Sequence, residues 1–171
     1  MLKILRSVNG LSYSMIMEVY GQSLRLAAEK EYPQKGENAG LLQAEQDYYA
    51  YLRDVHFLLN GAFMAVWEEK GVYISAVRVE PYQDGVLITG LETRSDFRNQ
   101  GYATMLLRAL TARCNAGEYP EIISHIDDDN VASIAVHTKC GFQKIADHAA
   151  FLDGTVSHIA CTMRYCPPHR R

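Results

Sequence analysis

Two early stretches of the chain carry hydrophobic residues at helical spacing. From Met15 to just before Pro33, apolar side chains return every three or four residues, at Ile16, Val19, Tyr20 and Ala27. From about Ala39 to Leu59 the pattern continues at Leu41, Ala44, Tyr48, Tyr51, Leu52 and Val55. Such spacing gathers the apolar residues on one helix face. We therefore predict two amphipathic helices after a first strand at Leu2–Val8.

The middle of the chain alternates between apolar runs and turn residues. Runs at Ala62–Glu68 and Val72–Glu80 are joined by Glu69-Lys70-Gly71, and a third run, Val86–Thr93, follows a turn ending at Gly85. Apolar runs of this length between turn residues are typical of strands in hairpins. The sequence therefore predicts an antiparallel meander of three strands.

The second half alternates strands with helices. A helix is expected from Gly101, with Ala103, Leu106, Leu107, Leu110 and Cys114 on one face, and a second from Asn130 to Cys140-Gly141. Strands are expected at Glu121–Ile126, Gln143–Asp147 and Val156–Tyr165. A strand–helix–strand unit implies a crossover and locally parallel pairing. We expect an α/β (α+β) fold with one mixed, mostly antiparallel sheet flanked by helices, in a single domain spanning residues 1–171.

Composition narrows the class of protein without giving its chemistry. The chain has 171 residues, 48% of them hydrophobic, and 17 basic against 20 acidic residues give a net charge of −3. This balance argues against a general nucleic-acid or anionic-membrane binder. No apolar run reaches the roughly 18 residues of a membrane span, and the start has no unbroken apolar segment typical of a secretory signal. The four cysteines form no CxxC pair, so we expect reduced thiols in a cytoplasmic protein. Neither the histidines nor Asp127–Asp129 have metal-ligand spacing, and no metal site is expected.

Two stretches carry candidate chemistry. In the first, the polar segment Arg98–Gln100 leads through Gly101 into a helix at Tyr102, Ala103 and Thr104. A helix start has unpaired N–H groups and the positive end of a dipole, so it binds phosphate well. Small residues let a pyrophosphate approach that backbone. In the second stretch, Asn130 is a good N-cap for the following helix.

Together the two stretches resemble the GNAT superfamily of acyl-CoA-dependent N-acyltransferases. Its first signature, Arg/Gln-x-x-Gly-x-Gly/Ala at the start of the helix after the fourth strand, is matched by Arg98, Gly101 and Ala103. Its second, an Asn opening the next helix, a small residue three positions on and a Gly-Phe at the end, is matched by Asn130, Ser133 and Gly141-Phe142. The order of elements also matches over essentially the whole chain.

The resemblance implies a sheet splayed between its fourth and fifth strands, with acetyl-CoA bound as co-substrate in the opening. The main chain around Leu91 and Thr93 would then pair with the pantetheine arm. The amides of Asn99, Gln100, Gly101, Tyr102, Ala103 and Thr104, beside Arg98, would hold the pyrophosphate. Asn130 and Ser133 would lie near the pantetheine or order the second helix.

The chain departs from the family pattern at two places. Thr93 and Ser95 stand where a hydrophobic residue and a proline often flank the loop. His137 occupies the position where many relatives carry a tyrosine as general acid toward the leaving thiolate. A histidine can donate that proton near neutral pH. The alternative is that His137 is only structural.

A base must also remove a proton from the substrate ammonium. Glu92, at the end of the third meander strand, is the first candidate, with His125 as the alternative; Glu92 could also be an ordinary exposed carboxylate. The sequence thus indicates an N-acetyltransferase that acts on a primary amine, most simply a small molecule. Open alternatives are a protein amine as acceptor, a longer acyl group, or a catalytically silent acyl-CoA-binding module. Whether the protein is a monomer or a homodimer is also left open.

Overall fold

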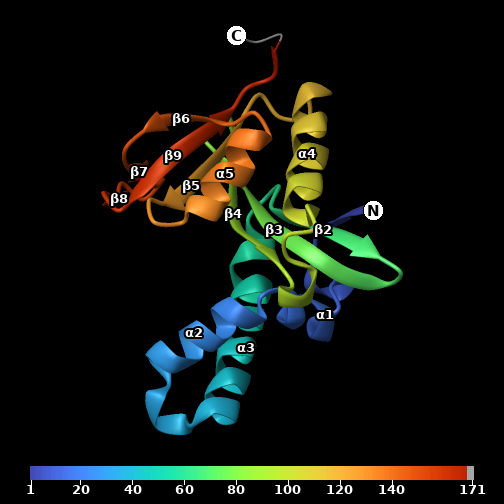
Figure 1. The fold of residues 1–171 in the computed structure, drawn as a ribbon, viewed down its shortest axis with the longest axis vertical. Helices are drawn as coiled ribbons and strands as arrows, with labels where there is room; N and C mark the ends of the chain where they lie inside the picture. Colours follow the sequence, from blue (N-terminus) through green and yellow to red (C-terminus); the bar gives the residue numbers. More distant parts are fainter. Residues whose placement is uncertain (169–171) are drawn as a thin grey trace.

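One mixed sheet organises the computed structural model, which describes residues 1–168. Within these residues, seven strands follow the order β1-β2-β3-β4-β5-β9-β6. The strands are β1 (Leu2–Leu5), β2 (Phe63–Glu69), β3 (Val72–Tyr82), β4 (Gly85–Thr93), β5 (Ile122–Asp127), β6 (Gln143–Ala146) and β9 (Ala160–Tyr165). Only β4 and β5 pair in parallel in this described part of the sheet. The predicted mixed, mostly antiparallel sheet is therefore confirmed (Figure 1).

Helices cover both faces of the sheet. The helices are α1 (Tyr13–Val19), α2 (Gly21–Glu31), α3 (Glu37–Asp54), α4 (Tyr102–Asn115) and α5 (Val131–Lys139). One core, with Leu106, Leu107 and Leu110 of α4, packs against β2, β3, β4, β5 and β9. A second core, on the other face, holds α1, α2 and α3 against Met64, Val66 and Ala76. The helical hairpin of α2 and α3 extends beyond the sheet in Figure 1. In residues 1–168, no helix is both long enough and apolar enough to cross a membrane.

The sheet splays between β4 and β5. These strands pair only at Val86–Ile88 with Ile122–Ser124, after which they diverge (Figure 1). Thr89–Thr93 of β4 therefore has no strand partner on the β5 side among residues 1–168. We call this segment the open edge of β4. Its backbone groups are available to an extended ligand.

A β-bulge lies within the open edge. Ala76 is opposite Glu92 and Arg78 is opposite Thr89, so two residues, Gly90 and Leu91, face Val77 alone. Gly90 has a φ of +60°, a conformation that L side chains rarely adopt. A bulge of this kind re-aims the side chains that follow it. It therefore sets which backbone and side-chain groups of β4 face the opening.

Some predicted boundaries were wrong. The helix expected from Met15 to Pro33 is divided at Tyr20, whose backbone leaves helical geometry between α1 and α2. Tyr20 itself is buried, and its hydroxyl donates a hydrogen bond to the carbonyl of Gly90. The first strand ends at Leu5 rather than Val8, and the second helix ends at Asp54, before a short 3-10 helix at His56–Leu58.

The long last strand predicted at Val156–Tyr165 is also divided. Val156–Ser157 (β8) pairs with Ala149–Ala150 (β7) in a separate two-stranded sheet, whereas β9 pairs with β5 and β6. Between them, the carbonyl of Ile159 accepts a hydrogen bond from the amide of Asp128. The two halves of the predicted strand therefore belong to different sheets.

Candidate active site

A cavity of about 690 Å³ runs along the open edge of β4. It is bounded by β4, by the facing residues of β5, by the loop and first turn of α4, by α5, and by Gln22, Ser23 and Leu26 of α2. Its volume falls within the usual range for small-molecule and cofactor sites. The splay of the sheet is thus what creates the candidate site.

The loop that enters α4 offers six main-chain N–H groups without acceptors. Within residues 1–168, the amides of Asn99 through Thr104 donate no hydrogen bond; the first bond of the turn comes from Met105, to Gly101. Asn99 and Gly101 have φ values of 60° and 87°, which turn the loop tightly into the helix. A Cβ at Gly101 would meet nothing within 4 Å, so this backbone faces open space. Free amides at the start of a 14-residue helix form an anion-binding end.

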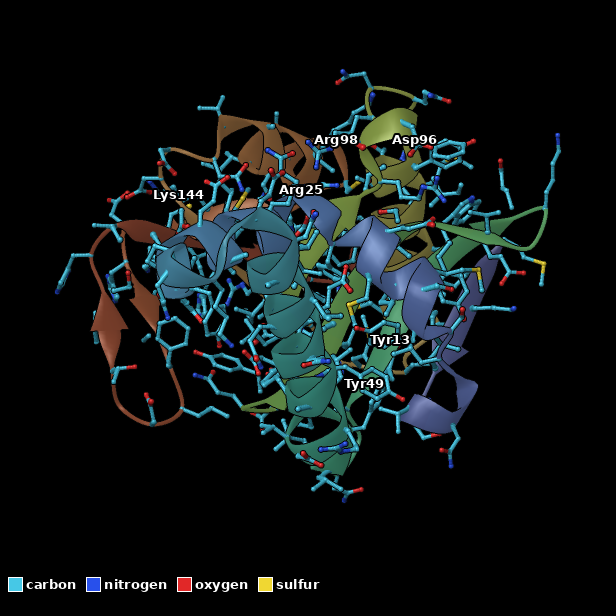
Figure 2. All side chains as sticks on the ribbon, turned by 90° about the horizontal axis from the view of Figure 1, so that it is seen from below. Tyr13, Arg25, Tyr49, Asp96, Arg98 and Lys144 are labelled. Carbon is cyan, nitrogen blue, oxygen red and sulfur yellow. The ribbon has the colours of Figure 1, made fainter. Side chains whose placement is uncertain are left out.

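Arg98 braces this loop instead of projecting freely. Its Nε donates to the carbonyl oxygen of Thr93 at 3.1 Å, and its Nη1 donates to the side-chain oxygen of Gln22. In Figure 2, Arg98 and Asp96 lie in the loop beside the start of α4. Arg98 therefore ties the end of β4 to α2 while keeping a positive charge next to the free amides.

The start of α5 is fixed by a side-chain cap. The Oδ1 of Asn130 accepts the amide N–H of Ser133 at 3.1 Å, as predicted for an N-cap. Asn130 and Ser133 both line the cavity. Of the two roles left open for Asn130, the structure shows the ordering of the helix.

His137 is buried on α5, where it lines the cavity with 1% of its surface exposed. Its Nδ1 lies 2.8 Å from the carbonyl oxygen of Ser133, which can only accept, so Nδ1 carries a proton. Its Nε2 is buried and has no hydrogen-bond partner in the described chain. Burial lowers the pKa of this imidazole. His137 is therefore neutral at rest and presents a lone pair at Nε2.

Glu92 lines the same cavity from the open edge of β4. The hydroxyl of Ser23 on α2 donates a hydrogen bond to its Oε1. Burial raises the pKa of Glu92, and the Ser23 hydrogen bond and the charges of Arg98 and Arg78 oppose this shift without cancelling it. A carboxylate with a raised pKa is a better proton acceptor than an exposed one.

His125, the alternative base, lies across the opening on β5. Its Nδ1 is 3.1 Å from the Oγ1 of Thr162, whose own proton is donated to the carbonyl of His148. Nδ1 therefore carries the proton, and Nε2 is buried without a partner among the described residues. Burial lowers the pKa of His125. It is a second neutral imidazole facing the cavity.

The cavity brings together nearly every residue singled out from the sequence. Gln100 is the exception, because its side chain turns back to the carbonyl of Asp96 and does not line the cavity. The tyrosines of α3 do not line it either: Tyr49 packs on Tyr13 of α1 (Figure 2), and Tyr48 packs on Tyr20. Within residues 1–168, no group of three or more acidic, histidine or cysteine side chains could hold a metal ion.

Sequence reasoning missed the residues that support β4 from behind. Ser23 on α2 holds Glu92, and Tyr20 holds the carbonyl of Gly90. Both lie some 70 residues before their partners, inside an ordinary helical pattern, so no local signal marks them.

Comparison with known families and structures gives one family and one fold. A family model described as the acetyltransferase (GNAT) family matches residues 22–142. This match includes the open edge of β4, the α4 loop and α5. A search of curated protein sequences gave no match.

Several solved structures share the fold at low sequence identity. The PaiA N-acetyltransferase from Thermoplasma acidophilum, solved with coenzyme A, is 10% identical with a TM-score of 0.64, over 97% of this chain and 99% of that one. An IAA acetyltransferase from Bacillus cereus is 12% identical with a TM-score of 0.60, over 97% and 98%. The ribosomal-protein-S18-alanine N-acetyltransferase from Escherichia coli is 15% identical with a TM-score of 0.56, over 97% and 94%.

Proposed function

Because the chain belongs to the acetyltransferase (GNAT) family, we propose that it transfers the acetyl group of acetyl-CoA to the primary amine of a small molecule. The observation that carries the proposal is the row of six free amides at one end of a cavity that also contains Glu92 and His137. A dianionic pyrophosphate satisfies such a row of donors. The open edge of β4 has the extended form that a pantetheine arm pairs with.

The cofactor contacts follow from this placement. The amides of Asn99 through Thr104 hold the pyrophosphate, and the positive charge of Arg98 adds to the potential there. The main chain at Leu91 and Thr93 lies along the pantetheine, with Ser133 and the capped start of α5 on the other side. Acetyl-CoA supplies an acetyl thioester at the inner end of this path.

During the transfer the substrate ammonium loses two protons, and one of them is delivered to the leaving sulfur. The amine nitrogen attacks the thioester carbonyl carbon, forming a C–N bond and an oxyanion that a main-chain N–H near Leu91 stabilises. Glu92 takes the proton released from the ammonium, directly or through a water molecule. The C–S bond then breaks, and the thiolate of CoA receives a proton.

His137 is the proposed donor of that last proton. Since its Nε2 is unprotonated at rest, the imidazole must first collect a proton from the reacting amine and then pass it to sulfur. His125, across the opening, is also a neutral imidazole protonated at Nδ1. It is the alternative base if Glu92 is not required.

Thiol release from acetyl-CoA over a panel of primary amines tests the proposal. The panel contains small amines and a peptide with a free N-terminus, and calorimetry measures CoA affinity in parallel. We expect thiol release with a small amine and acetylation of that amine by mass spectrometry. A higher rate with the peptide would overturn the small-molecule acceptor and indicate a protein amine instead. Tight CoA binding without turnover of any amine would show an acyl-CoA-binding module and overturn it.

A further inference from the structure

A guanidinium without an acidic partner lies directly behind the β4 bulge. Arg78 of β3 is half-buried, and no carboxylate within residues 1–168 lies within salt-bridge distance of it. Its Nε donates to the hydroxyl of Thr89 at 3.3 Å, and no other hydrogen bond of its side chain is found in this part of the chain. A partly buried charge left in this state is costly unless something pairs with it.

Aromatic rings leave one edge of this guanidinium for a ligand. Its central carbon lies 5.7 Å from the ring centre of Tyr48 and 5.2 Å from that of Tyr51. Rings in these positions stabilise a cation but accept no hydrogen bond in the plane of the guanidinium. Because Nε is used by Thr89, the unused edge is the Nη1–Nη2 pair, which binds a carboxylate through two parallel hydrogen bonds.

A second donor in the same cluster makes no hydrogen bond of ordinary length. The hydroxyl of Tyr48 is buried and is near the hydroxyl of Tyr20, with no closer acceptor among the described residues. Burial raises the pKa of Tyr48 to about 12, so the phenol keeps its proton and remains a donor. The nearby carboxylate of Glu80 makes no hydrogen bond with Tyr48; its Oε1 is bonded by His56 and Tyr51.

The cluster adjoins the proposed reaction centre. A Cβ at Gly90 would lie 3.1 Å from Nη2 of Arg78, and Gly90 itself lines the cavity. Ala76 is opposite Glu92 in the sheet, and Arg78 is two residues further along β3. At the usual rise of a strand, this is a separation of about 7 Å along the sheet. The proposed base and the unpaired cation are thus neighbours.

We infer that the acetyl acceptor is a primary amine that also bears a carboxylate, with its amine near Glu92 and its carboxylate on Arg78. This inference rests on the proposed acetyl transfer and specifies its substrate class. Opposite charges on neighbouring strands complement a zwitterion such as a small amino acid. An uncharged or polycationic amine would leave Arg78 unpaired.

Matched pairs of amines test the inference. Each pair differs only by the carboxylate: glycine and methylamine, β-alanine and ethylamine, 4-aminobutyrate and propylamine. Aminopropylphosphonate tests whether another oxyanion is accepted. We expect the carboxylated member of at least one pair to have a kcat/KM about tenfold to a hundredfold higher, the range of a charge-assisted hydrogen-bonded pair. A preference for the phosphonate over every carboxylate would overturn the assignment.

Variants separate this role from a structural one. Arg78→Met should abolish the preference for the carboxylated member while leaving CoA affinity unchanged, and Arg78→Lys should keep part of it. Arg6→Met is the matched control, since Arg6 also packs over an aromatic ring, that of Phe63, whereas Arg78 is the guanidinium that reaches Thr89 and Gly90 on the open edge. A preference that survives Arg78→Met would overturn the inference, and so would equal use of all pairs.

The failure of this inference and that of the proposed function look different. Turnover without carboxylate preference contradicts only the inference. Absence of turnover with every amine contradicts the proposed function. In that case the inference is still tested by calorimetry of the CoA-loaded protein, which compares the binding affinities of the two members of each pair. Equal binding, or no binding of any carboxylate, would contradict the inference as well.

Discussion

The hydroxyl of Tyr20 donates a hydrogen bond of 2.7 Å to the carbonyl oxygen of Gly90, 70 residues further along the chain. The peptide that follows Gly90 is trans, so the N–H of Leu91 points away from Tyr20. One hydrogen bond therefore fixes the plane of the peptide whose N–H is proposed to stabilise the oxyanion. Arg98 likewise orients the peptide that follows Thr93, by donating a hydrogen bond from its Nε to the carbonyl oxygen of Thr93.

The first prediction concerns Tyr20. In Tyr20→Phe the carbonyl of Gly90 loses its donor, which should cost about 0.5–1.5 kcal/mol of unfolding free energy. A looser peptide should also lower kcat more than it raises the KM for acetyl-CoA. Tyr13→Phe is the control, because Tyr13 bonds Glu45 at the surface, and its cost should be about 0.5 kcal/mol or less. Denaturant unfolding and steady-state kinetics decide, and equal effects of the two variants would contradict the assignment.

The second prediction separates the anion site from backbone strain. Gly101 and Gly117 have the same φ of +87°, and a Cβ at either would meet nothing within 4 Å. Gly101→Ala and Gly117→Ala should therefore each cost about 1–2 kcal/mol of stability. Only Gly101→Ala should weaken CoA binding, by about tenfold, because only that loop carries the free amides. Calorimetric titration with CoA checks this, and equal affinities would remove the loop from the site.

The third prediction follows from the raised pKa of Glu92. A carboxyl whose folded-state pKa exceeds the unfolded value of about 4.3 contributes stability below that value, and loses it as pH rises through the folded pKa. Glu92→Gln should thus be more stable than the native protein at pH 7, with the difference vanishing near pH 4. Its activity should fall, and the acidic limb of kcat/KM should disappear. A surviving acidic limb would exclude Glu92 and favour His125. Glu45→Gln serves as a surface control.

The fourth prediction concerns the lowered pKa of His137. The unfolded chain binds a proton near pH 6.5 more readily than the buried imidazole does, so stability is present above that pH and is lost as pH falls below it. One such group contributes a slope of up to about 1.4 kcal/mol per pH unit. His137→Gln should flatten the loss of stability between pH 6.5 and 5, leaving the part due to His125. It should also lower kcat with little change in acetyl-CoA affinity. An unchanged dependence of stability on pH would contradict the assigned titration of His137. An unchanged kcat would contradict its proposed role as proton donor.

The sequence predicts those parts of the molecule whose causes are local. The turn at Glu69-Lys70-Gly71 is an example, since Lys70 and Gly71 both have positive φ between antiparallel strands. The Asn130 cap is another, because an N-cap residue and the amide it bonds lie three residues apart. The crossover through α4 and the parallel pairing it predicts also follow from element order alone.

What the sequence could not predict depends on distant partners. Tyr20 fits the helical pattern, yet the helix is interrupted there and the Tyr20 hydroxyl bonds Gly90 of a strand 70 residues further on. His137 could be read as a surface acid until its burial and the carbonyl of Ser133 showed a neutral ring. Arg78 reads as one of two charges, with Glu80, in a mostly apolar strand, and only the packing of α3 over β3 gives it tyrosine neighbours.

The three residue pairs that join β4 to β5 have a mechanical consequence. They are the only hydrogen-bonded ladder between the two halves of the described sheet, and the remaining connection is the hydrophobic core around α4. A ligand arm laid along the open edge lengthens that joint with the backbone bonds that the chain itself does not make. If the pantetheine arm lies there as proposed, the co-substrate also joins the two halves of the sheet, and we expect the loaded protein to be the more rigid form.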